Sequence, residues 1–170
     1  MDEVGYNKEM DLIYRMIGDG KYALAVKSMM LEEGFGLKGV YRFDANHSWY
    51  VLGNIFLKSG DHALAIKSFN RSLKSWPGDV DALMAVGNVY SEMGRCKMAE
   101  RFFRKGLLIK PENSALRFNL ANALFDQGKL DLARKEYELI AKKGEELSDK
   151  AKKMMSVITQ KIGKGAHHRP

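Results

Sequence analysis

Side chains able to perform acid–base, nucleophilic or metal chemistry are few and scattered in this sequence. The histidines are His47, His62, His167 and His168, and Cys96 is the only cysteine. Catalysis requires converging groups, and no histidine has a partner at metal-ligand or catalytic-triad spacing on one helix face. A single cysteine excludes a disulfide within the chain and any zinc or redox motif built on a cysteine pair. The sequence therefore predicts a protein that is not an enzyme and that has no metal site and no cofactor.

A glycine-rich segment, Gly34 to Gly39, has the pattern G-x-G-x-x-G. In a dinucleotide-binding fingerprint this pattern follows a strand and opens a helix. Here it follows a segment with helical periodicity. We therefore expect a hinge between two repeated units at this place, and no nucleotide site.

The most informative polar residues form a column at regular spacing. Asn54, Asn88 and Asn122 follow one another at one constant interval. They fall inside segments predicted to be helical, where asparagine is a poor helix former. Two roles could favour asparagine there: binding the backbone of a guest peptide, or bracing neighbouring helices. The residues alone leave both roles open.

The same interval recurs in the segments that must position these asparagines. Its columns are Gly60, Gly94, Gly128 and Ala65, Ala99, Ala133. Within each unit, apolar residues recur every three or four positions on both sides of the glycine, which predicts two amphipathic helices joined by a tight turn. A glycine at a helix end can adopt the left-handed conformation that closes it. A longer offset aligns Gly20 with Gly60, so a further unit precedes these and extra residues separate it from the next.

These units resemble the tetratricopeptide repeat, whose 34-residue signature contains Trp, Leu, Gly, Tyr, Ala, Phe and Pro. The matching residues are Trp49, Leu52, Gly53, Phe56, Ala65, Phe69 and Pro77 in one unit; Leu83, Val86, Gly87, Tyr90, Ala99, Phe103 and Pro111 in the next; and Leu120, Ala121, Leu124, Ala133 and Tyr137 in the last. The resemblance implies an all-α fold, a right-handed superhelical solenoid of antiparallel helix pairs.

The predicted organisation places a leader at residues 1–5 and four repeats at 6–147. The repeats are 6–39, which is degenerate, then 46–79, 80–113 and 114–147, with an insertion at 40–45 that either lengthens a connection or extends a helix. Residues 148–162 are predicted to form an amphipathic capping helix, which stacked repeats need at an open end. Residues 163–170 are expected to be a basic, disordered tail.

The resemblance also implies a peptide-binding groove on the concave face made by the first helix of each repeat. The residues expected to line it are His47, Tyr50, Asn54, Met84, Asn88, Phe118, Asn119, Asn122 and Phe125. The family's charged groove for C-terminal carboxylates is not expected, because Tyr50, Ala115 and Asn119 stand where that groove has lysines and an arginine. Phe118 and Phe125 have an alternative role, which is packing beneath the capping helix.

The net charge of +7 is unevenly distributed, with −2 in residues 1–94 and +9 in residues 95–170. The leading hypothesis is a non-catalytic scaffold that binds a peptide segment of a partner protein. The alternative is binding to nucleic acid or another anionic surface through the basic half, although stacking aromatics are not interleaved with the basic residues as strand binding requires. Self-association at an open repeat edge or at the capping helix would give a homo-oligomer. The charged first residues form neither a signal peptide nor a transmembrane span, and a lone thiol suits a reducing compartment, so a cytoplasmic location is expected.

Overall fold

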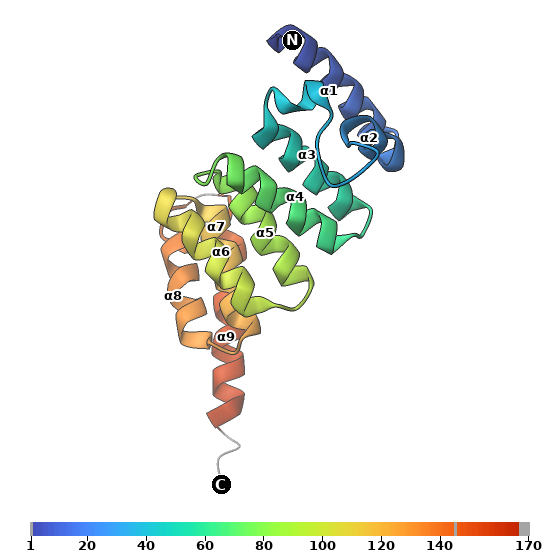
Figure 1. Ribbon diagram of the computed structural model, residues 1–170. Coiled ribbons are helices and arrows are strands. Elements are labelled where there is room, and N and C mark those ends of the chain that lie inside the picture. The colour runs from blue at the N-terminus through green and yellow to red at the C-terminus, as the bar shows by residue number, and fades with distance from the viewer. Residues whose placement is uncertain (1, 145, 167–170) are drawn as a thin grey trace. The chain divides into compact units, whose positions relative to one another are not determined.

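The computed structural model describes residues 2–144 and 146–166, and this part of the chain is helical, with one isolated β-bridge between Met30 and Leu37 (Figure 1). It divides into two compact units at residues 89 and 90. The first unit contains α1 (Glu3–Gly18), α2 (Tyr22–Met29), the 3₁₀ helix η1 (Gly39–Arg42), α3 (Ala45–Lys58), α4 (His62–Ser75) and most of α5 (Val80–Glu92). The second contains the end of α5, then α6 (Cys96–Ile109), α7 (Ser114–Asp126), α8 (Leu130–Ala141) and α9 (Ser148–Ala166).

Glycine turns join the two helices of each repeat, as the sequence predicts. The φ angles at Gly60, Gly94 and Gly128 are +80°, +70° and +73°. At the end of α3, Gly60 N–H donates to the carbonyl of Leu57 and Asp61 N–H to that of Phe56. The Asp61 carboxylate then accepts from Leu64 N–H at 2.9 Å and so caps α4. These bonds satisfy backbone groups that a helix end otherwise leaves unpaired.

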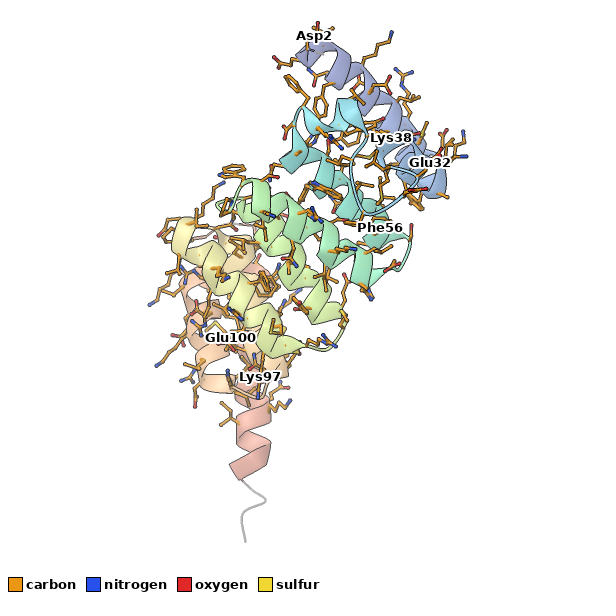
Figure 2. The ribbon with its side chains drawn as sticks, in the orientation of Figure 1. Asp2, Glu32, Lys38, Phe56, Lys97 and Glu100 are labelled. Carbon is orange, nitrogen blue, oxygen red and sulfur yellow. The ribbon has the colours of Figure 1, made fainter. Side chains whose placement is uncertain are left out.

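The core of the first unit depends on a close approach of α3 and α4. A Cβ atom added to Gly53 would lie 2.5 Å from the ring of Phe69, so only glycine fits there. Leu52, Ile55 and Phe69 are fully buried, and Phe56 on α3, labelled in Figure 2, is nearly so. The small residue of the repeat signature therefore sets the spacing between the two helices.

The first repeat departs from the pattern in its second helix. α2 has 8 residues, whereas α4 has 14. After Met29 the chain forms a closed loop in which Leu31 N–H donates to the Gly36 carbonyl, and Phe35 stacks 5.1 Å from the ring of Trp49. The loop thus covers aromatic surface of α3 that a longer α2 would otherwise have to bury. The glycine-rich motif belongs to this loop.

The inserted residues 40–45 contribute to η1, to the residues after it and to the first residue of α3. Tyr41 of this segment is buried, and its hydroxyl donates to the Glu9 carboxylate of α1 at 3.4 Å. The insertion therefore lengthens the connection between two repeats through a single helical turn, which anchors α1.

A polar cluster fastens the start of α3 to α4 and α5. The Asn46 amide donates to the Ser72 hydroxyl at 2.7 Å and to the Asp79 carboxylate at 2.9 Å. Asp79 is buried and also accepts from the backbone N–H groups of Asp81 and Ala82. Because every bond satisfies a buried polar group, the cluster fixes how these three helices meet.

In the second unit, α7 packs between α6 and α8, and α9 covers α8. Its buried residues include Phe103, Leu116, Leu120, Leu124, Tyr137, Ile140, Ala151 and Ile158. The last two belong to α9, which therefore closes the core as the predicted capping helix would.

Two predicted ends of segments differ from the structure. α9 continues to Ala166, so residues 163–166 are helical and not part of a disordered tail. The prediction for residues 167–170, which include His167 and His168, lies outside the described residues. At the other end, α1 begins at Glu3, inside the predicted leader, because the Asp2 carboxylate caps it by accepting from Gly5 N–H at 3.0 Å.

Candidate functional site

The clearest hollow among the predicted groove residues lies between α1 and α3 in the first unit. It has a volume of about 480 Å³ and is lined by Tyr14, Ile17, His47, Tyr50, Val51, Asn54, Leu57 and Lys58. On α3 these positions recur every three or four residues, so they share one helix face. The structure therefore brings together three of the nine predicted residues, His47, Tyr50 and Asn54.

His47 connects α3 to α1 through both of its ring nitrogens. Nδ1 lies 2.7 Å from the Tyr6 hydroxyl, and Nε2 lies 2.8 Å from the Tyr14 hydroxyl. Burial raises the pKa of Tyr6 to about 12, so this hydroxyl keeps its proton near neutral pH. In a neutral imidazole one nitrogen donates and the other accepts. Because both nitrogens are already bonded, His47 shapes the wall of the hollow and fixes Tyr14 beside it.

Tyr50 and Asn54 lie one helical turn apart on α3 and both line the hollow. Burial raises the pKa of Tyr50, and the carboxylates of Asp81 and Asp79 raise it further, against the opposing effect of the nearby Asn54 side chain. The hydroxyl is therefore protonated near neutral pH. A carboxamide has two donor hydrogens and an acceptor oxygen, so Asn54 can both donate to and accept from a ligand.

Two further predicted residues, Met84 and Asn88, lie on α5. Both are half-buried, and their spacing of one helical turn places them on one face of the helix. The structure thus supports a shared helix face for them within the first unit.

The remaining predicted residues lie on α7 in the second unit. Phe118, Asn119, Asn122 and Phe125 are half-buried and follow one another at helical spacing. The Asn122 carbonyl oxygen accepts a hydrogen bond from the Tyr137 hydroxyl of α8, whose pKa is raised by burial. This bond places Asn122 in the bracing role that the sequence analysis left open.

The two phenylalanines of α7 contact neighbouring helices. The ring of Phe118 meets that of Tyr137 edge-on, with 5.5 Å between centroids. The Lys161 ammonium of α9 lies 4.9 Å from the centre of the Phe125 ring. Phe125 therefore contacts the capping helix, as the alternative role weighed for it requires, whereas the ring contact of Phe118 is with α8.

The α1 wall of the hollow was not predicted from the sequence. Tyr14 and Ile17 were absent from the expected set, as were Val51, Leu57 and Lys58 on α3. The alignment of Gly20 with Gly60 could have identified Tyr14, because the same offset places Tyr14 in register with Asn54. Because Tyr14 is a tyrosine where the later repeats have asparagine, the residue type did not identify it as a member of the column.

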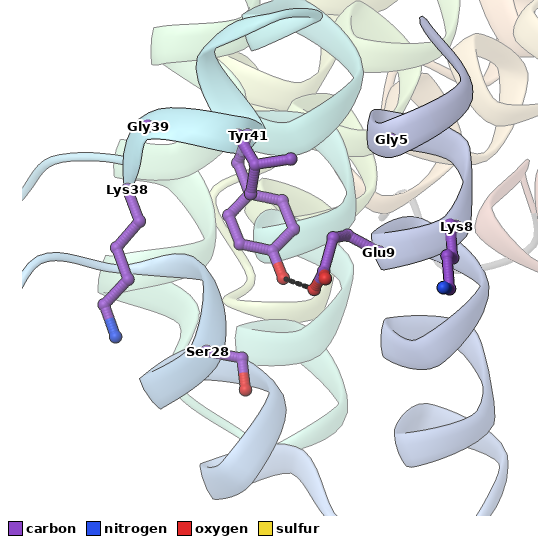
Figure 3. Close-up of a pocket in the computed structure, with 8 residues that line it drawn as sticks. Gly5, Lys8, Glu9, Ser28, Lys38, Gly39 and Tyr41 are labelled. Atoms are coloured by element: carbon purple, nitrogen blue, oxygen red, sulfur yellow. Dashed lines mark hydrogen bonds between the residues drawn. The ribbon is translucent and has the colours of Figure 1, made fainter. Parts of the chain in front are cut away.

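A second hollow of about 600 Å³ lies between α1, α2 and η1 (Figure 3). In Figure 3, Glu9 turns toward Tyr41 and Ser28 lies on the facing helix. The Lys38 ammonium donates to the Lys27 carbonyl at 2.7 Å. The hollow holds one carboxylate and no nucleophile paired with a base, so it has no catalytic constellation.

Residues 2–144 and 146–166 contain no group of three or more histidine, cysteine, aspartate or glutamate side chains placed to hold a metal ion. Cys96 is half-buried, and its thiol lies 3.5 Å from the Gly94 carbonyl. Among the described helices, none is long and apolar enough to cross a membrane.

Comparison with known families agrees with this geometry of paired helices and glycine turns. Models of the tetratricopeptide repeat match residues 50–95 and 92–158, which together cover more than half of the chain. The chain belongs to the tetratricopeptide repeat family. Its fold is accordingly an all-α solenoid of antiparallel helix pairs.

Several individual proteins are similar to this chain at low identity. Superkiller complex protein 3 from Homo sapiens is 28% identical over 102 residues, which are 60% of this chain and 6% of that protein. The chain therefore spans less than a tenth of that relative. The AMB-1 structure of MamA has a TM-score of 0.70 at 20% identity and covers 95% of this chain and 85% of its own. The second repeat domain of human RPAP3, solved with an HSP70 peptide, has a TM-score of 0.59 at 20% identity, covering 67% and 98%.

Proposed function

We propose that this tetratricopeptide repeat chain is a non-catalytic, cytoplasmic scaffold that binds a peptide segment of a partner protein in the groove of its first helices. The observation that carries the proposal is the hollow between α1 and α3, which gathers His47, Tyr50 and Asn54. The similar domain of human RPAP3 was solved with a peptide, which supports the same use of the fold here.

The composition of the hollow suits peptide binding in energetic terms. Hydrogen bonds from amide side chains contribute about 0.5–1.5 kcal/mol each, whereas micromolar binding requires about 8 kcal/mol. Apolar contacts must supply most of the difference. Ile17, Val51 and Leu57 provide such contacts beside the Tyr50 and Asn54 pair.

For the predicted groove residues outside the hollow, contact with the bound segment remains a prediction. Met84 and Asn88 are half-buried on α5, and Asn119 is half-buried on α7. For Asn122, Phe118 and Phe125, the bonds and ring contacts to α8 and α9 support a structural role beside any contact with a peptide.

A matched pair of asparagine variants tests the proposal. The wild-type chain is used to isolate partners from a cell lysate, and each partner identified is then titrated against Asn54→Ala and Asn70→Ala by calorimetry. Asn70 lies exposed on α4, the second helix of the same repeat, so it controls for the loss of an amide. We expect Asn54→Ala to weaken binding about tenfold, the equivalent of about 1.4 kcal/mol, and Asn70→Ala to leave it unchanged. Equal binding by both variants, with unchanged melting temperatures, would contradict the proposal.

A further inference from the structure

The walls of the α1–α3 hollow indicate the chemistry of the side chain that enters it. The rings of Tyr14 and Tyr50 and the aliphatic chains of Ile17, Val51 and Leu57 make most of its surface apolar. Tyr14 is 46% exposed although its hydroxyl is bonded to His47, so its ring is open to contact. Burying apolar surface contributes about 25 cal/mol for each Å² removed from water. The hollow therefore favours an aliphatic or aromatic side chain.

The imidazole of the hollow does not compete for that side chain, because the structure already pairs it. His47 uses both ring nitrogens on tyrosine hydroxyls. A buried polar group without a partner would penalise an apolar ligand. The pairing removes that penalty at His47, and the Asn54 amide of the lining can serve the peptide backbone.

One charged group stands at the edge of the hollow. Lys58 lies in the last turn of α3, is exposed, and makes no ion pair with any residue that the structure describes. Tyr50 and Lys58 are separated by about 12 Å along the helix axis. Among the residues that line the hollow, Lys58 is the one lysine, and the lining contains no arginine, aspartate or glutamate. The hollow is thus basic at its Lys58 end.

We infer that the bound segment carries an apolar anchor side chain in this hollow and an acidic residue beside it that pairs with Lys58. This inference rests on the proposed function and specifies its ligand. The expected partner is an internal protein segment in which an aliphatic or aromatic residue is flanked on one side by aspartate or glutamate.

Peptide display tests this chemistry without knowledge of the natural partner. The probe is a phage library of random twelve-residue peptides whose C-termini are fused to the coat protein, selected on the immobilised full chain. The fusion removes free C-terminal carboxylates from the selection. We expect the enriched peptides to share an apolar residue with a neighbouring aspartate or glutamate.

Charge reversal at Lys58 supplies the decisive comparison. An enriched peptide is synthesised with a fluorophore and titrated by anisotropy against Lys58→Glu and, as control, Lys74→Glu, which changes the same residue type in the last turn of α4. Lys58→Glu should weaken binding about tenfold or more and redirect selection toward lysine or arginine, while Lys74→Glu should do neither. Replacing the apolar anchor of the peptide by serine should also abolish binding, a change that cannot affect folding of the protein.

The outcomes separate this inference from the proposed function. If the enriched peptides lose affinity for Asn54→Ala but bind Lys58→Glu as tightly as the wild type, the inferred ion pair with Lys58 is wrong and the proposed groove function stands. If a peptide still binds after serine replaces its apolar anchor residue, the inferred apolar anchor is wrong. If no enriched peptide depends on Asn54, the proposed function itself fails.

Discussion

At the residue scale, one column of asparagines serves different contacts. Asn54 lies one helical turn from Tyr50 on the same helix and lines an open hollow. Asn122, two repeats later, accepts from Tyr137 of the neighbouring helix. The difference arises because Tyr137 is a tyrosine, whereas Phe69 and Phe103 hold the same place in the earlier repeats and carry no hydroxyl to donate.

The bracing role of Asn122 can be measured by a double-mutant cycle. We expect Tyr137→Phe and Asn122→Ala each to lower the free energy of unfolding by about 1–2 kcal/mol, because each removes one partner of a partly buried hydrogen bond. The double variant should lose less than the sum. Urea denaturation of the four proteins gives the coupling energy, and strictly additive losses would show that the bond contributes nothing. Asn54→Ala should cost less, since Asn54 lines an open hollow.

Glu100 on α6, labelled in Figure 2, is a second residue whose role is structural. Its carboxylate accepts from Lys129 at 2.8 Å, from Gln127 at 2.9 Å and from Arg104 at 2.9 Å. Burial alone would raise the pKa of Glu100, but these donors outweigh it and lower the pKa from 4.5 to about 2. A pKa lowered by folding means that the ionised carboxylate stabilises the fold above pH 4.5, and that this stabilisation is lost as the pH falls from 4.5 toward 2.

Glu100→Gln should therefore lower the free energy of unfolding by about 1 kcal/mol at pH 7, because two ion pairs are lost. The difference in free energy of unfolding between the variant and the wild type should disappear as the pH approaches 2, where the carboxyl of the wild type is also neutral. Urea titrations at pH 7 and at acid pH measure both values. Glu138→Gln, which removes a more exposed pair with Arg134, is the control and should cost less. A difference in free energy of unfolding that stays constant with pH would show that the ionised Glu100 carboxylate does not stabilise the fold.

At the scale of elements, the spacing of helix pairs depends on a glycine that local propensity would reject. Alanine is the better helix former by about 1 kcal/mol, yet Gly53 lies inside α3 against the ring of Phe69. Gly53→Ala should consequently lower the free energy of unfolding by about 1–3 kcal/mol through overpacking. Gly163→Ala in α9 is the matched control, since no atom lies within 4 Å of the added methyl group. Thermal unfolding should show a lower melting temperature for the first variant and no decrease for the second.

At the scale of the whole molecule, the positive charge lies in the C-terminal part of the chain, away in sequence from the α1–α3 hollow. Several of these cations are already paired, for example Arg117 with Glu136 at 2.8 Å and Lys143 with Glu112 at 2.7 Å. Binding through phosphate contacts would lose about 10³-fold or more in affinity between 50 and 200 mM salt. A peptide held by apolar contacts, one amide and a single ion pair should lose less than about tenfold. Anisotropy titrations of a display-selected peptide at both salt concentrations decide between the two.

The repeat period, the helix pairs and the turns could be read from the sequence because their causes are local. Apolar spacing indicates a helix face, and a glycine such as Gly60 closes a helix through its own backbone freedom. The regular recurrence of these signals identified the family before any contact was known. The resemblance to that family in turn implied that His47, Tyr50 and Asn54 lie on one concave face.

Contacts between segments distant in the chain could not be read in this way. Tyr14 and His47 are 33 residues apart, yet their bond helps to shape the hollow. Phe35 lies in a loop without periodic pattern and covers Trp49, and the Tyr137 hydroxyl selects Asn122 as its acceptor. Each depends on where packing brings two side chains together, and no local preference of either residue encodes that distance. Which predicted residues share a hollow, and which brace a neighbouring helix, therefore emerged only once the helices were packed.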